Sequence, residues 1–142
     1  MSTVNNLKRV LGGTDFIPNS INSDLDYSDV IISGLPHQSV KHVQEYIGAS
    51  EVQMANFLAI TPKTYRSRKD RYTLDESNHV FAIAKVVSQA ETVLGSKEDA
   101  LKWLNSMQMA LGDRVPFEII KTVAGQHAVE DLLGKIYYGV YV

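Results

Sequence analysis

The residues with the clearest chemical potential are five cationic side chains close together in the sequence: Lys63, Arg66, Arg68, Lys69 and Arg71. They make up five of the fourteen basic residues, and the same stretch holds only one of the sixteen acidic residues, Asp70. Because the whole chain has a formal charge of −2, the rest of it is acidic and would repel a polyanion that this segment attracts. The chemistry to expect is hydrogen bonding to phosphates and to the edges of nucleic-acid bases.

The four histidines offer a second chemistry, metal coordination or acid–base catalysis, but their spacing favours neither. They are His37, His42, His79 and His127, and they form no HExxH motif and no i,i+4 pair. The chain has no cysteine, which excludes disulfides, thiolate nucleophiles and cysteine zinc sites. No set of nucleophile, base and oxyanion donors can be assembled. We therefore expect no catalytic residues, no metal, no cofactor and no enzymatic activity.

Two helix starts precede the cationic cluster, at Ser50 and at Thr61. Ser50 and Gln53 form a capping box, which predicts the start of one helix. Thr61 is a good N-cap and Pro62 suits the first helical position, which together predict a second helix. This spacing is typical of a helix-turn-helix, whose second helix enters the major groove of DNA.

The turn between these helices is the weaker part of the match. Ala59 occupies the turn, where many such motifs have glycine, and alanine accepts a left-handed conformation less readily. Ile60 and Tyr65 can fill the space between the two helices, and the small Ala55 would let them cross closely. The pattern still indicates a helix-turn-helix.

With Tyr65 packed inward, helical geometry turns the polar side chains of the second helix outward together. The residues expected to contact DNA are Thr61, Lys63, Thr64, Arg66, Ser67, Arg68, Lys69 and Arg71. Arg66 is the best candidate for reading a base, since its guanidinium can bond guanine O6 and N7. Arg68, Lys69 and Arg71 are better placed for phosphates.

The alternative interpretation of this segment is a solvated cationic face without a ligand. Specific binding by so small a unit would need a dimer on a two-fold site.

Apolar residues at helical spacing predict an all-α fold. The expected helices span about 39–47, 50–58, 61–70, 73–95, 96–104, 116–125 and 126–138. In this interpretation, Gly125 closes the helix that begins at Pro116. Residues 1–36 show little helical periodicity and are expected to form a mostly irregular arm, in which 29–32 could be a strand. This gives an arm at 1–36, a helix-turn-helix domain with a long connecting helix at 37–94, and a small helical domain at 95–142.

The composition is that of an ordinary globular protein. Apolar residues make up 44% of the chain and charged residues 21%. No run approaches the roughly 18 apolar residues that a membrane span needs, and the first residues lack the apolar segment of a signal peptide. We expect a cytoplasmic protein without a membrane partner.

The C-terminal half has a series of glycine, alanine, proline and larger apolar landmarks in a fixed order. They are Gly95, Leu101, Trp103, Leu104, Ala110, Gly112, Pro116, Phe117, Ile120, Thr122, Gly125, Val129 and the run 136–140. In this order the landmarks resemble the toxin-binding domain of the Xre/MbcA/ParS antitoxin family. In that family a helix-turn-helix region precedes the domain, as the motif at 50–70 does here, so the resemblance covers about residues 38–142.

The resemblance implies a type II toxin–antitoxin module. Such an antitoxin binds a RES-domain toxin that consumes NAD⁺, and the complex represses its own promoter. The C-terminal helix and tail approach the mouth of the toxin's active site, and the matching residues here are Ile136, Tyr137, Tyr138, Gly139, Val140, Tyr141 and Val142. The expected partners are a RES-domain toxin, double-stranded operator DNA that is palindromic, and a second copy of the chain.

The residues of the tail support a protein interface on their own. Three tyrosines fall within five positions, 137–141, and tyrosine is enriched in the cores of interfaces. The alternative is that Tyr137 and Tyr138 pack against the chain's own helices. Two other functions also remain open: a stand-alone helix-turn-helix regulator whose C-terminal domain dimerises or senses a ligand, and an interaction module whose basic helix binds nothing.

Overall fold

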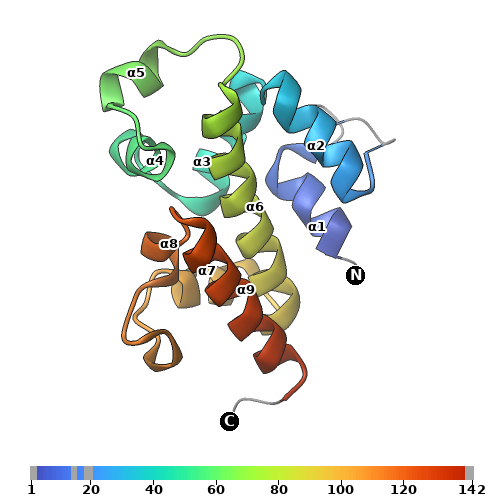
Figure 1. Cartoon of the computed structure of the whole chain (residues 1–142), viewed down its shortest axis with the longest axis vertical. Helices are drawn as coiled ribbons and strands as arrows, with labels where there is room; N and C mark the ends of the chain where they lie inside the picture. The colour runs from blue at the N-terminus through green and yellow to red at the C-terminus, as the bar shows by residue number, and fades with distance from the viewer. Residues whose placement is uncertain (1–2, 14–15, 18–20, 140–142) are drawn as a thin grey trace.

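The computed structural model describes residues 3–13, 16–17 and 21–139, and over these residues the fold is all-α, as predicted (Figure 1). In chain order the helices are α1 (Thr3–Val10), α2 (Asp24–Ser33), α3 (His37–Ile47), α4 (Glu51–Leu58), α5 (Pro62–Ser67), α6 (Leu74–Leu94), α7 (Lys97–Leu104), the short 3-10 helix η2 (Met109–Leu111), α8 (Pro116–Ile119) and α9 (Val123–Tyr137). The described part contains no strand, only two isolated bridges.

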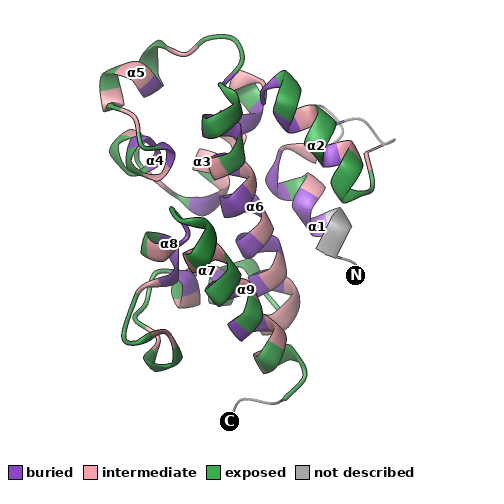
Figure 2. Ribbon diagram, in the orientation of Figure 1, coloured by how far each residue is buried: buried purple, intermediate pink, exposed green. Residues whose placement is uncertain are grey.

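The long helix α6 is the axis around which the other helices pack (Figure 1). It begins at the predicted capping box, where Thr73 and Glu76 bond each other's backbone amides, and it ends at Gly95 in a left-handed conformation. Val80, Ala84 and Val87 are fully buried, and residues on most sides of the helix are covered. Figure 2 shows this burial along its length.

No helix in the described part is both long and apolar enough to cross a membrane.

The N-terminal segment differs from the expected irregular arm, because it forms two helices. In α1 and just after it, Leu7, Val10 and Leu11 recur at helical spacing and are buried against α6. α2 starts at a capping box of Ser23 and Asp26 and contains the run 29–32 that could have been a strand. Both helices are short, so their apolar period covers few turns, and it is burial against α6 that stabilises them.

The C-terminal helices differ from the expected ones at Gly125. α8 ends at Ile119, and α9 starts four residues later with Thr122 as its N-cap, whose hydroxyl accepts a hydrogen bond from the Gly125 amide. Gly125 therefore lies in the first turn of α9 and does not close a helix. A side chain there would overlap the carbonyl oxygen of Ile119, so glycine is needed for the close approach of α8 and α9.

Two glycines of α9 give a matched pair of tests. Gly125→Ala should destabilise the fold by about 1–3 kcal/mol, because the new methyl group must push the α8 backbone away. Gly134→Ala meets open space in the same helix and should stabilise it by roughly 0.5–1 kcal/mol, since alanine loses less backbone entropy. Urea unfolding of both variants measures the difference. Equal effects of the two substitutions would contradict the role given to Gly125.

Candidate DNA-binding and protein-binding surfaces

The turn between α4 and α5 has the geometry that the sequence predicted for a helix-turn-helix. Ala59 adopts the left-handed conformation with φ 58° and ψ 39°, and its amide donates to the carbonyls of Ala55 and Asn56 at the end of α4. Thr61 then caps α5 by accepting a hydrogen bond of 3.1 Å from the Thr64 amide, and Pro62 takes the first helical position. The left-handed conformation costs alanine about 1–2 kcal/mol relative to a right-handed one. The hydrogen bonds of the turn form nevertheless.

Tyr65 fixes the orientation of α5, as its predicted inward position requires. The side chain is 1% exposed, and its hydroxyl donates a hydrogen bond of 2.7 Å to Oε1 of Gln44 in α3. Its ring lies 6.1 Å from the ring of Tyr72, centroid to centroid. Burial is the main cause that raises the pKa of the Tyr65 hydroxyl, and the neighbouring Tyr72 and Glu51 raise it further. The phenol therefore stays neutral and keeps donating to Gln44.

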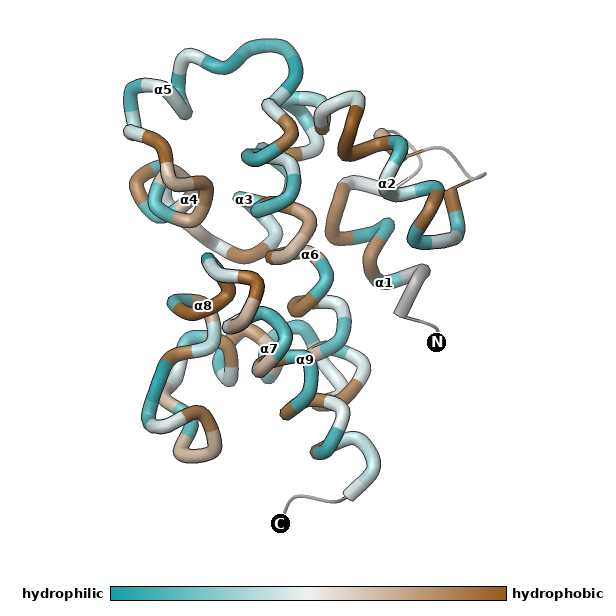
Figure 3. Tube along the Cα trace, viewed as in Figure 1, coloured by the Kyte–Doolittle hydropathy of each residue, from teal (hydrophilic) through white to brown (hydrophobic). Residues whose placement is uncertain are grey.

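The opposite side of α5 carries most of the predicted DNA contacts. The exposed members are Thr61, Lys63, Arg66, Ser67, Lys69 and, beyond the helix, Arg71, and Thr64 is half-buried. The side chain of Arg66 is 57% exposed, and its Nη1 lies 4.0 Å from Oε1 of Glu51 on α4. A contact of that length at the surface is weak and easily exchanged for a ligand. Figure 3 shows a continuous hydrophilic stretch over α5 and the segment that leads to α6.

Arg68 and Arg71, predicted as phosphate contacts, already have partners within the chain. Nη2 of Arg68 lies 2.7 Å from Oε2 of Glu76, whose side chain is 5% exposed. Nη1 of Arg71 donates to the Gly34 carbonyl at 2.7 Å. The sequence analysis missed both bonds, because one partner is eight positions away and the other 37. These two arginines fasten the segment after α5 to α6 and to the C-terminal end of α2.

The Arg68–Glu76 pair predicts how stability depends on pH. Burial acts to raise the pKa of Glu76, but the hydrogen bonds from Arg68 and from the Thr73 amide outweigh it and hold the pKa below the ordinary 4.5. A carboxylate whose pKa is lowered by folding stabilises the fold at pH values above its pKa in the unfolded chain. It loses that contribution as the pH falls through its pKa in the folded chain.

We expect Glu76→Gln to lower the free energy of unfolding at pH 7 by about 2 kcal/mol, the range for a hydrogen bond to a charged group. The difference from the wild type should shrink as pH falls below 4.5. Glu98→Gln, at an exposed first-turn position of α7, is the control and should change little. Denaturant unfolding from pH 7 to pH 3 measures both variants, and a pH-independent difference would contradict the assignment.

The predicted protein-binding tail is exposed where the structure describes it. Ile136 is half-buried, while Tyr137 and Tyr138 are 59% and 78% exposed. The two tyrosine rings contact each other edge to face, with centroids 5.1 Å apart. Gly139 is also exposed, and Val140, Tyr141 and Val142 lie outside the described residues. The tyrosines therefore do not bury themselves against the chain's own helices, which was the alternative interpretation of the tail.

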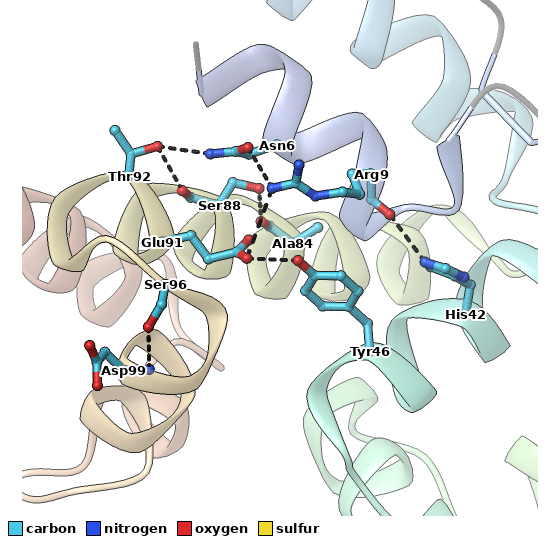
Figure 4. Close-up of polar contacts among 10 residues, drawn as sticks. All are labelled: Asn6, Arg9, His42, Tyr46, Ala84, Ser88, Glu91, Thr92, Ser96 and Asp99. Atoms are coloured by element: carbon cyan, nitrogen blue, oxygen red, sulfur yellow. Dashed lines mark hydrogen bonds and ion pairs between the residues drawn. The ribbon is translucent and has the colours of Figure 1, made fainter. Parts of the chain in front are cut away.

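A buried carboxylate connects the N-terminal helices to the C-terminal half (Figure 4). Glu91 of α6, with a side chain 7% exposed, accepts a hydrogen bond of 2.7 Å from the Tyr46 hydroxyl of α3 and lies 4.0 Å from the Arg9 guanidinium of α1. Burial and the Glu91 bond raise the pKa of Tyr46. Lys97 at the start of α7 lies 4.1 Å from the centroid of the Tyr46 ring. No local signal in the sequence could have indicated this cluster, whose members come from four helices.

Next to this cluster is an open cavity of about 460 Å³ that reaches the tail. It is lined by Asn6, Arg9, Glu91, Thr92, Gly95, Ser96, Lys97 and Tyr137. Within the described residues, no three histidine, aspartate or glutamate side chains are grouped in a way that could hold a metal ion. The cavity is a polar recess between α1, the end of α6 and α9.

Comparison with known proteins connects these surfaces to a family. Residues 89–139 match the Antitoxin Xre/MbcA/ParS C-terminal toxin-binding domain, which extends from the last turns of α6 to Gly139. The predicted resemblance is confirmed for this segment. The helix-turn-helix precedes the matched residues.

Curated relatives extend the similarity towards the N-terminus. The chain is 25% identical over 115 residues to Antitoxin Xre of Photorhabdus laumondii, covering 78% of each chain. It is 28% identical over 102 residues to Antitoxin Xre of Yersinia enterocolitica, covering 70% of this chain and 69% of the other. Antitoxin Xre of Pseudomonas putida is 31% identical over 80 residues, which is 54% of this chain and 50% of the other.

A solved structure shares the fold. A chain of the crystal structure of the M. tuberculosis MbcT-MbcA toxin-antitoxin complex superposes with a TM-score of 0.54 over 75% of this chain and 96% of its own length, at 16% identity. The helical arrangement is therefore one that exists in a solved toxin–antitoxin complex.

Proposed function

Because residues 89–139 match the Antitoxin Xre/MbcA/ParS C-terminal toxin-binding domain, we propose that this chain is an antitoxin that neutralises a RES-domain, NAD⁺-consuming toxin and represses its own promoter. The proposal assigns DNA binding to residues 37–94, toxin binding to 95–142, and a cytoplasmic location to the whole. The observation that carries it is the exposed Tyr137–Tyr138 pair, which ends the last helix of the toxin-binding domain.

The tail is suited to closing a protein's active site. Two aromatic side chains, 59% and 78% exposed, contact each other. Tyrosine has only two χ angles, so each ring supplies a large contact area at a low entropy cost when a partner covers it. Contiguous exposed apolar surface marks interaction sites, and tyrosine is enriched among the residues that dominate binding energy. The RES class of the toxin follows from the family resemblance.

The toxin-binding role predicts the effect of removing these rings. Tyr137→Ala with Tyr138→Ala should weaken toxin binding by at least 2 kcal/mol, about thirtyfold, which is the threshold for a dominant interface residue. Deletion of 137–142 should abolish protection of cells that express the toxin. Operator binding should persist in both variants, since α5 lies at the opposite end of the molecule (Figure 1).

The measurements are growth rescue and calorimetry with a RES-domain protein, to be sought in the reading frame next to the one that encodes this chain. Val123→Ala, at the start of α9 and 72% exposed, is the control from the same helix and should rescue fully. Full rescue by the truncated chain would refute the role of the tail. Without a neighbouring RES-type reading frame, a stand-alone regulator with the 460 Å³ cavity as its sensor becomes the better proposal.

DNA binding is supported by the exposed cationic side of α5. Lys63, Arg66 and Lys69 are exposed there, and the buried Tyr65 anchors the helix on the other side. Arg68 and Arg71, which bond Glu76 and Gly34, keep the following segment in place, and they can contribute positive potential to a phosphate without leaving those bonds. A second copy of the chain would present the same helix to a palindromic operator.

Arg66→Ala tests the assignment of the base-reading residue. Loss of a bidentate contact to guanine should cost about 1–3 kcal/mol and relax the preference at one operator position. Lys69→Ala should instead weaken binding to operator and random DNA alike, and lower the salt dependence, as for a phosphate contact. Lys121→Ala, exposed between α8 and α9, is the control. Fluorescence anisotropy on both DNAs measures these effects, and equal losses for Arg66→Ala on the two DNAs would contradict base reading.

A further inference from the structure

A second apolar surface lies in the segment between α7 and α8, residues 105–115, away from the tyrosines in sequence. Met107 is 70% exposed and Met109 88% exposed, among the most exposed large apolar side chains of the described residues. The segment lies within the stretch that matches the toxin-binding domain. Figure 3 shows hydrophobic positions at its tip. Neither methionine contributes to the chain's own core, so folding alone does not explain them.

This segment is held in a defined shape by its own hydrogen bonds. The Gln108 amide donates to the Arg114 carbonyl, and the Asp113 amide donates to the Gln108 carbonyl, both at 3.0 Å. The side-chain Nε2 of Gln108 lies 3.0 Å from the Trp103 carbonyl and 3.3 Å from that of Ser106. Leu111 packs against the core, and η2 contacts α9. The two methionines are therefore presented on an ordered support, which lowers the entropy that a binding partner must overcome.

A groove lies at the base of the same segment. It has a volume of about 340 Å³ and is lined by Leu94, Asp99, Lys102, Trp103, Ser106 and Gln108. Trp103 is half-buried, so part of the indole remains available on the groove side. A groove of this size accepts one or two apolar side chains, and the charges of Asp99 and Lys102 would orient a partner at its edge. Methionine side chains can adapt to the surface that covers them.

The position of the segment indicates what covers it. The tip of the segment and the end of α9 lie at the same end of the molecule's long axis, opposite to α5 (Figure 1). Together they expose two methionines and two tyrosines within one toxin-binding domain. We infer that Met107 and Met109 form, with the groove beside Trp103, a second docking surface for an apolar patch of the same toxin that Tyr137 and Tyr138 bind. This inference rests on the proposed function and gives the toxin a two-part contact.

The test substitutes the methionines with a polar residue of the same length. Met107→Gln with Met109→Gln should weaken binding to the purified RES-domain protein at least tenfold. The control is Leu25→Gln with Ile32→Gln, which changes two apolar residues of α2 that are 80% and 67% exposed, outside the matched domain. That variant should bind within twofold of the wild type, and both variants should unfold at the wild-type temperature, because all four side chains are exposed.

The outcomes separate this inference from the proposal on which it depends. Wild-type affinity in the methionine variant, together with lost affinity in the Tyr137→Ala and Tyr138→Ala variant, would overturn the second surface and keep the antitoxin function. Equal weakening by the methionine and α2 variants would also overturn it, since the effect would not belong to this surface. Absence of binding by the wild-type chain would overturn both.

Discussion

The packing of α6 is the constraint on which both candidate binding surfaces depend. α1, α2, α3, α4, α7 and α9 contact it, so the helix is an axis with the α4–α5 pair near its start and the residues that match a toxin-binding domain around its end. Its fully buried residues, such as Val80, Ala84 and Val87, leave no room for the packed helices to slide along α6. The distance between the two surfaces is therefore set by the length of one rigid element.

Two carboxylates of α6 connect that axis to its surroundings, one near each end. Glu76 holds the segment after α5 through Arg68, and Glu91 joins α3 to α1 through Tyr46 and Arg9. A buried charge is stable only where donors surround it, so each carboxylate restricts its neighbours to one arrangement. The polar contacts specify how the helices sit, while apolar burial supplies most of the driving force.

Sequence signals that act within one helical turn predicted where the helices start. Contacts between segments far apart in the sequence could not be predicted. The capping residues Ser50, Thr61 and Thr73 start the helices that their side chains predicted, because an N-cap acts within one turn. Gly125 was misinterpreted, since a glycine that ends a helix and one that allows a close approach look alike in sequence. The bonds of Arg68 and Arg9 join segments that only the folded chain brings together. Likewise, α1 and α2 were missed because burial against α6 stabilises them.

The left-handed Ala59 has a consequence for how this protein can vary. Almost every other left-handed position among the described residues is a glycine, and the remaining exception is Asp113. The chain thus tolerates backbone strain at the turn between α4 and α5, while nearly all other described residues avoid it. Glycine at this position would adopt the same conformation without the cost that alanine carries. Alanine and glycine codons differ at one nucleotide, so a single mutation separates the strained turn from a relaxed one that keeps the same shape.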